Sequence, residues 1–115
     1  QMCIRDRFTY ELARRLEGMG ITANCLHPGL VRTNFARGVR GWFGTVMRAL
    51  RPFAISPEEG ARTSIHLASS PDVQGITGRY FARQKEARSS RRSYDLDAQK
   101  RLWELSAELT GSGTS

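Results

Sequence analysis

The apolar residues near the start of the chain recur every three or four positions, as they do on one face of an α-helix. They are Phe8, Leu12, Leu16 and Met19, with charged residues between them. The pattern predicts an amphipathic helix that ends at Gly18 and Gly20. The short apolar run 21–26 follows, bounded by glycine and by Pro28, which favours a buried strand. Asn24 lies inside that strand and needs a hydrogen-bond partner.

The sequence Ser56-Pro57-Glu58-Glu59 is a helix start. A serine cap, proline at the first helical position and glutamate three residues after the cap form a capping box. The helix is expected to run to about Ser69 and to bury Ala61, Ile65 and Ala68.

A second strand, a polar loop and a last helix are predicted for the rest of the chain. Ile76 to Phe81 is predicted to form a second strand, and the polar stretch 83–92 a mobile loop. A last helix is expected over 95–109, ending at Gly111, and its apolar face comprises Leu102, Trp103, Leu105 and Leu109. Helices that alternate with short buried strands predict the α/β class.

Residues 35–53 differ from the rest of the chain in their pattern of apolar residues and arginines. Apolar side chains recur at helical spacing with arginines between them, and glycines precede them. The apolar residues are Trp42, Phe43, Val46, Met47, Leu50 and Phe53, and the arginines are Arg40, Arg48 and Arg51. Three interpretations fit: a lid over an apolar substrate, a membrane-surface helix, or an ordinary core helix.

The composition narrows the protein class. A chain of 115 residues, 39% of them hydrophobic, suffices for one domain. No run approaches the roughly 18 apolar residues of a membrane span, and no secretory signal is visible. Cys3 and Cys25 form neither a disulfide framework nor a zinc ligand set. We therefore expect a reduced, cytoplasmic protein without a metal.

The charge balance is basic, with 18 Lys and Arg against 11 Asp and Glu, or +7. This balance leaves open a small basic module that binds nucleic acid or an acidic membrane surface. No nucleic-acid-binding motif accompanies the charge, so solvated arginine faces and no nucleic-acid partner are the favoured interpretation.

His27-Pro28-Gly29 leaves the first predicted strand at its carboxyl end. Ligands of open α/β sheets bind beyond the carboxyl ends of the strands. Proline lacks a donor and glycine lacks a side chain, so a ligand can approach the backbone here. Thr33 and Asn34 offer polar groups just downstream.

In order and spacing, four stretches resemble the C-terminal part of a short-chain dehydrogenase/reductase of the retinol-dehydrogenase-like branch. They are Glu11-Leu-Ala-Arg-Arg-Leu-Glu-Gly18, Ala23-Asn-Cys-Leu-His-Pro-Gly-Leu-Val-Arg-Thr33, Gly75-Ile-Thr-Gly-Arg-Tyr-Phe81 and Arg101-Leu-Trp-Glu-Leu-Ser106. The resemblance covers residues 8 to about 111. It implies the C-terminal portion of a doubly wound, Rossmann-type parallel sheet, incomplete in this chain.

The resemblance also implies a cofactor site and a substrate lid. Pro28, Gly29, Leu30 and Val31 would give backbone contacts to the nicotinamide, and Thr33 would hydrogen-bond its carboxamide or the adjacent phosphate. Residues 35–53 would form the lid, with Phe35, Trp42, Phe43, Val46, Met47 and Leu50 facing a lipophilic alcohol, aldehyde or ketone. NAD or NADP is implied, with NADP slightly favoured, and a homo-oligomer is left open for the intact protein.

The chain departs from the family pattern in its catalytic residues. It has no glycine-rich dinucleotide turn, and the catalytic Ser, Tyr and Lys would lie before Phe8. Tyr10 with Arg14 has the right spacing, but arginine cannot replace the lysine that lowers a tyrosine's pKa. Residues 1–7 do not continue the resemblance, and we interpret them as a foreign junction segment. Residues 8–111 would then be part of one dehydrogenase domain, and 112–115 a flexible tail.

Overall fold

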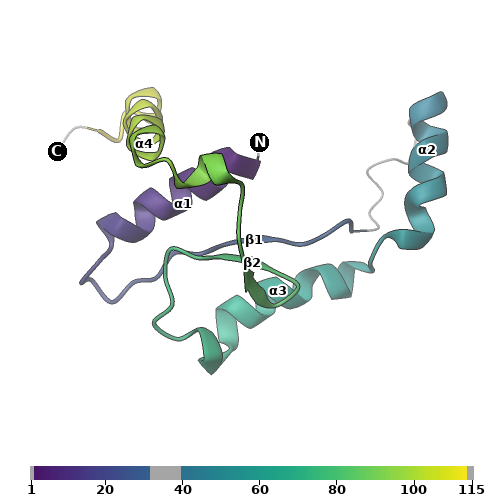
Figure 1. The fold of residues 1–115 in the computed structure, drawn as a ribbon, viewed down its shortest axis with the longest axis horizontal. Helices are drawn as coiled ribbons and strands as arrows, with labels where there is room; N and C mark the ends of the chain where they lie inside the picture. The colour runs from purple at the N-terminus through teal and green to yellow at the C-terminus, as the bar shows by residue number, and fades with distance from the viewer. Residues whose placement is uncertain (1, 32–39, 114–115) are drawn as a thin grey trace.

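The computed structural model of the protein describes residues 2–31 and 40–113 (Figure 1). In chain order the elements are α1 (Met2–Arg15), β1 (Cys25–His27), α2 (Trp42–Leu50), α3 (Pro57–Ser69), β2 (Tyr80–Ala82), β3 (Lys85–Ala87) and α4 (Leu96–Thr110). Among the described residues they are connected by the short 3-10 helices η2 (Arg51–Phe53), η3 (Pro71–Val73) and η4 (Arg91–Tyr94). The predicted mixture of helices and strands is confirmed.

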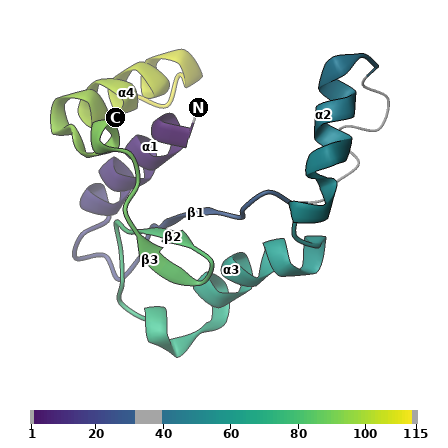
Figure 2. The same cartoon turned by 45° about the vertical axis from the view of Figure 1, so that its right-hand side comes forward.

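The three strands form one small sheet in the order β1-β2-β3. β1 pairs in parallel with β2, with Cys25 opposite Tyr80, and β2 pairs antiparallel with β3. A parallel pair needs a crossover connection, and here the connection contains α3. α1 and α4 lie on one side of the sheet and α3 lies on the other (Figures 1 and 2). The strands therefore form the middle of three layers.

Asn24 joins β1 to the segment that leads into β2. Its side-chain amide donates to the carbonyl of Ile76 at 2.8 Å, and its Oδ1 accepts from the amide of Arg79 at 3.1 Å. The Ala23 carbonyl accepts from the amide of Gly78 at 2.8 Å. The partner predicted for Asn24 is thus a pair of backbone groups, and these bonds fix the register of the parallel pair.

The stretch 83–92 is not the loop that its polarity predicts. β2 and β3 are joined by Arg83 and Gln84, which both have positive φ (50° and 63°). Positive φ at both central residues is the geometry of the tight hairpin turn that usually contains Asn or Gly. The Thr63 hydroxyl of α3 accepts from the amide of Gln84 at 3.1 Å. A tertiary contact therefore supports a turn that Arg-Gln does not signal.

The helix α3 begins as its sequence predicts. The Ser56 hydroxyl accepts from the amide of Glu59 at 3.1 Å, and Pro57 is the first helical residue. The predicted buried face is wrong, however: Ala61, Ile65 and Ala68 are exposed. Gly60 and Thr63 are buried instead, because α3 rests on the turn after β1 and on the hairpin. No described element covers the other face.

The best-packed part of the protein is the contact of α1 with α4. Phe8 stacks on Trp103 with ring centroids 4.9 Å apart, and the Arg15 guanidinium lies 4.7 Å from the same indole. Tyr10 stacks on Tyr94 at 5.3 Å, which adds η4 to this unit. The last helix spans nearly the predicted residues, and its end at Gly111 is confirmed.

α1 starts earlier than its apolar pattern predicts. It begins at Met2, so it runs through the stretch interpreted as foreign, and it ends at Arg15. Asp6 from that stretch is buried. The helix buries Tyr10, Glu11 and Ala13 and leaves Phe8 partly exposed.

α2 contradicts the interpretation of residues 35–53 as a core helix. The predicted helical spacing is confirmed, but α2 stands apart from the sheet and has no extensive contact with the other α-helices (Figure 2). Trp42 at its start and Phe53 just after its end are 79% and 80% exposed. The lid and membrane-surface interpretations remain.

We expect the α1–α4 unit to weaken in acid through Glu11. Burial raises the pKa of this carboxyl, but bonds and charge from Arg14 and Arg15 outweigh burial and lower it below its usual value. A carboxyl whose pKa is lower in the folded protein than in the unfolded chain stabilises the fold at pH values above the unfolded-state pKa. This contribution is lost as the pH falls through the folded-state pKa. Glu11→Gln should cost about 1 kcal/mol at neutral pH and make the stability less pH-dependent.

Urea titrations of Trp103 fluorescence in a Trp42→Phe background measure this effect at neutral pH and below the lowered pKa. Glu17→Gln is the control, because Glu17 is an exposed carboxylate of the next turn. Equal losses from the two substitutions would contradict the role of Glu11.

Gly60→Ala should loosen the contact between α3 and the turn after β1. A Cβ at position 60 would lie 2.6 Å from Cγ2 of Val31, closer than real contacts allow. Such overpacking costs about 1 to 3 kcal/mol. The amide of Ile55, bonded to the carbonyl of Leu30, should then exchange its hydrogen at least fivefold faster. Ser64→Ala on the exposed side of α3 should leave this rate unchanged.

Candidate functional site

The turn that leaves β1 is the candidate site. The amide of Gly29 donates to Nδ1 of His27 at 3.0 Å, which bends the chain directly after the strand. Gly29 has φ +87°, in the left-handed region that favours glycine. Pro28 and Leu30 are exposed on either side of it. The turn therefore presents its backbone beyond the carboxyl end of β1.

Ile55 holds this turn from one side. Its amide donates to the carbonyl of Leu30 at 2.9 Å, and Val31 forms a parallel bridge with it. A Cβ on Gly29 would lie 3.2 Å from Cδ1 of Ile55, so the turn lies directly against this side chain. The sequence analysis missed Ile55. In the sequence, Ile55 stands out only as a β-branched residue immediately before a strong helix cap. Only the tertiary structure shows which residues it contacts.

A hollow of about 400 Å³ lies beside the turn, among α1, β1 and α4. Phe8 and Leu102 form apolar parts of its wall, and Asp6, Cys25 and Tyr80 form polar parts. His27 and Pro28 also line it. The start of the turn therefore borders open space and is not sealed inside the fold.

Cys25 in this hollow is poorly suited to be a nucleophile. Burial raises the pKa of its thiol to about 12, and the charge of Asp6 adds to the effect. The thiolate is the reactive form of cysteine, and it is scarce at neutral pH when the pKa is so high. Burial, followed by Asp6, also raises the pKa of Tyr80. Neither the thiol nor the phenol is therefore activated by its surroundings.

The structure brings the predicted cofactor residues together but not the lid. Pro28, Gly29, Leu30 and Val31 form the single turn held by Ile55, whereas Thr33 and Phe35 lie outside the described residues. The other predicted lid residues, Trp42, Phe43, Val46, Met47 and Leu50, all lie on α2. α2 stands beyond the carboxyl end of β1 and does not pack on the turn (Figure 1).

Tyr10 and Arg14 do not form a catalytic pair. The Tyr10 hydroxyl shares a hydrogen bond of 2.8 Å with the Ser89 hydroxyl, and burial raises its pKa. Arg14 pairs with Glu11. The tyrosine is therefore harder to deprotonate than usual, opposite to what proton transfer at neutral pH needs.

Residues 2–31 and 40–113 contain no group of three or more His, Cys, Asp or Glu side chains placed to hold a metal ion. None of their helices combines the length and the apolar character needed to cross a membrane.

No protein-family profile matches the chain, but individual proteins do. Retinol dehydrogenase 14 of Mus musculus is 46% identical over 110 residues, which cover 90% of this chain and 32% of that protein. Retinol dehydrogenase 12 of Homo sapiens is 38% identical over 104 residues, 90% of this chain and 33% of that protein. Polyprenol dehydrogenase of Homo sapiens is 38% identical over 108 residues, with 90% and 32% covered.

The chain thus spans about a third of the length of the curated relatives it matches. These relatives are dehydrogenases of the group that the four sequence stretches indicate. The predicted resemblance to the retinol-dehydrogenase-like branch of the short-chain dehydrogenases/reductases is therefore confirmed.

Proposed function

We propose that this chain is the C-terminal part of an NAD(P)-dependent oxidoreductase. The intact enzyme would transfer hydride between a nicotinamide and a lipophilic alcohol, aldehyde or ketone. The observation that carries the proposal is the 46% identity to a retinol dehydrogenase over a region that includes the turn after β1. The names of the relatives, retinol and polyprenol dehydrogenases, favour a lipophilic substrate.

The sheet supports the view that the domain is incomplete. β1 pairs with β2 along one edge, and no described strand pairs with its other edge. Its three residues are only half-buried, although parallel strands are normally covered on both faces and paired on both sides. We propose that further parallel strands of a Rossmann-type sheet extend from this edge.

The overall dimensions agree with that proposal. The Cα radius of gyration is 17.1 Å, against about 13 Å for a compact domain of this length. Large apolar side chains are exposed on α1, α2, α3 and α4 alike. A chain that closed its own core would bury most of them.

The turn after β1 fits the role of a cofactor wall. Pro28 and Leu30 are exposed and Gly29 is half-buried, while Ile55 holds the turn from the other side. These residues and Val31 would orient the nicotinamide ring, and Thr33 would bind its carboxamide or the adjacent phosphate. The nicotinamide supplies the hydride chemistry, so the task of this chain is to fix its orientation. NADP is the favoured form.

α2 fits the role of substrate lid. It carries several large, exposed apolar side chains, and the helix stands beyond the carboxyl end of β1 (Figure 1), where ligands of such sheets bind. We propose that they close over a lipophilic substrate. The serine, tyrosine and lysine for proton transfer would come from residues outside this chain.

We expect the isolated chain to be inactive. The purified protein with NAD or NADP and a lipophilic alcohol should show no change in nicotinamide absorbance. Residues 8–115 should support turnover when they replace the matched segment of the mouse Retinol dehydrogenase 14. Turnover by the isolated chain, or a folded chimera that binds no cofactor, would contradict the proposal.

In the same chimera, Gly29→Ala should weaken cofactor binding by about tenfold. The substitution adds a strained left-handed residue, at a cost of about 1 to 2 kcal/mol, and brings its Cβ to 3.2 Å from Ile55. Titration calorimetry with NADP measures the change. Gly75→Ala is the matched control, because Gly75 also has positive φ but has open space around it. Equal losses would show that backbone strain alone, not the turn, is responsible.

A further inference from the structure

A second hollow, of about 540 Å³, lies between the β2–β3 hairpin and η4, and we call it the η4 hollow. Its wall includes Gly78, just before β2, and Ala87, which pairs with the first residue of β2. Since β1 and β2 are parallel, the turn after β1 lies at the opposite end of the sheet. The strand β1 contributes no residue to the hollow. The further strands proposed beyond β1 would therefore extend away from it.

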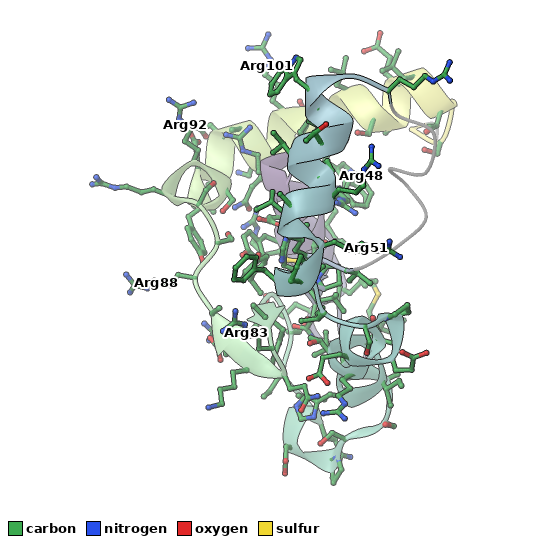
Figure 3. All side chains as sticks on the ribbon, turned by 90° about the vertical axis from the view of Figure 1, so that its right-hand side faces the viewer. Arg48, Arg51, Arg83, Arg88, Arg92 and Arg101 are labelled. Carbon is green, nitrogen blue, oxygen red and sulfur yellow. The ribbon has the colours of Figure 1, made fainter. Side chains whose placement is uncertain are left out.

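Positive charge dominates the wall of the η4 hollow. Its charged residues are Arg79, Arg88, Arg91 and Glu86. Glu86 pairs with Arg79 at 3.4 Å. Arg88 and Arg91 are exposed, and neither forms an ion pair with another residue that the structure describes. Figure 3 shows Arg88 extending outward from the segment before η4. Two guanidinium groups are thus available to an anion.

Tyr94 adds a third donor to the same wall. Its hydroxyl accepts a hydrogen bond from the amide of Ser89 at 3.1 Å, and the phenol still has its own proton to donate. Burial raises the pKa of Tyr94, but hydrogen bonds from its neighbours, Ser89 first, and the charge of Arg88 outweigh burial and lower it below its usual value. The charge of Arg88 therefore acts directly on this hydroxyl.

Hydrogen bonds hold the segment that carries these donors. Ser93 is fully buried, and its hydroxyl donates to the carbonyl of Ser90. The Ser93 oxygen is then left to accept from the Ser89 hydroxyl, and the Ser89 oxygen to accept from Tyr10. Tyr10 also stacks on Tyr94, with ring centroids 5.3 Å apart. A site ordered in this way before a ligand arrives loses little conformational freedom when the ligand binds.

The donors of the η4 hollow suit a phosphate group. A phosphate monoester carries nearly two negative charges at neutral pH and three acceptor oxygens, and the planar guanidinium of arginine matches pairs of such oxygens. We propose that the η4 hollow binds a phosphate group, free or as the monoester of a small molecule, with Arg88, Arg91 and Tyr94 as its donors. Pockets for small molecules usually measure about 300 to 1,000 Å³, so the hollow also has room for the organic part of an ester.

The probes are inorganic phosphate and phenyl phosphate, added to the full 115-residue chain at neutral pH. Both should shift the amide NMR signals of Arg88, Ser89, Arg91 and Tyr94 until they saturate. Tighter binding of phenyl phosphate would assign the hollow to a monoester, and equal or weaker binding would assign it to free phosphate. Benzenesulfonate has the same ring and a single charge, so it should bind at least about fivefold more weakly than phenyl phosphate.

The donors are tested by two double variants that lose the same charge. Arg88→Gln/Arg91→Gln should weaken phosphate binding by roughly tenfold or more, because a hydrogen bond to a charged group contributes about that factor. Arg92→Gln/Arg101→Gln changes arginines outside the hollow (Figure 3) and should leave the affinity nearly unchanged. Tyr94→Phe keeps an aromatic ring against Tyr10 and should weaken binding by about fivefold. Circular dichroism checks that the variants keep the helix content of the parent.

The proposal is overturned if phosphate leaves the signals of residues 88–94 in place. Equal weakening by the two arginine variants would also overturn it, because binding would then be spread over the basic surface. Equal affinity for phenyl phosphate and benzenesulfonate would show that the hollow does not recognise phosphate. Gly29→Ala alters the turn after β1 and should leave phosphate binding unchanged, so the proposal can fail while the proposed function holds. A loss of binding in this variant would place the probes at the turn instead.

Discussion

The pairing of β1 with β2 is the interaction on which the rest of the structure depends. These are two strands of three residues each, and backbone ladders of that length are weak by themselves. Asn24 adds hydrogen bonds to Ile76 and Arg79, which both lie in the segment that leads into β2. Since the strands are parallel, the chain must cross from the end of β1 to the start of β2, and α3 makes that crossing.

The crossing fixes the geometry of the candidate site. α3 begins near the carboxyl end of β1, where Ile55 lies against Leu30 and Gly60 against Val31. The turn after β1 is therefore held by the same segment that returns the chain to the sheet. A larger residue at position 60 or a poorer cap at Ser56 would act on the turn without touching a ligand.

Local signals in the sequence predicted the elements whose hydrogen bonds lie within a few residues. The Ser56 cap, the glycine end of α4 and the turn at Gly29 all belong to this group. Sequence also indicated that Asn24 needs a partner, because a buried amide in a strand is costly. It could not say which partner, since Ile76 and Arg79 lie more than fifty residues away.

The features that sequence missed depend on distant contacts. Arg83 and Gln84 form a tight hairpin turn supported by Thr63, twenty-one residues from Gln84. The buried face of α3 was wrong because helical spacing shows that a face is apolar, not whether another element covers it. Ile65 is 60% exposed for this reason. The same limit applies to the turn after β1 and to α2, because the sequence does not show how these two segments lie relative to one another.

The exposed apolar surfaces of this protein are not all equivalent, and charge distinguishes them. Around Ile65 on α3, Glu58, Glu59 and Arg62 give mixed charges, and Arg62 pairs with Glu59 at 3.2 Å. Such a surface is suited to another part of a protein, where both signs find partners. On α2, Arg48 and Arg51 accompany the exposed apolar residues, and the chain contains no acidic residue between Glu17 and Glu58. A partner of α2 would therefore meet charge of one sign along this segment, whereas a partner of α3 would meet both signs.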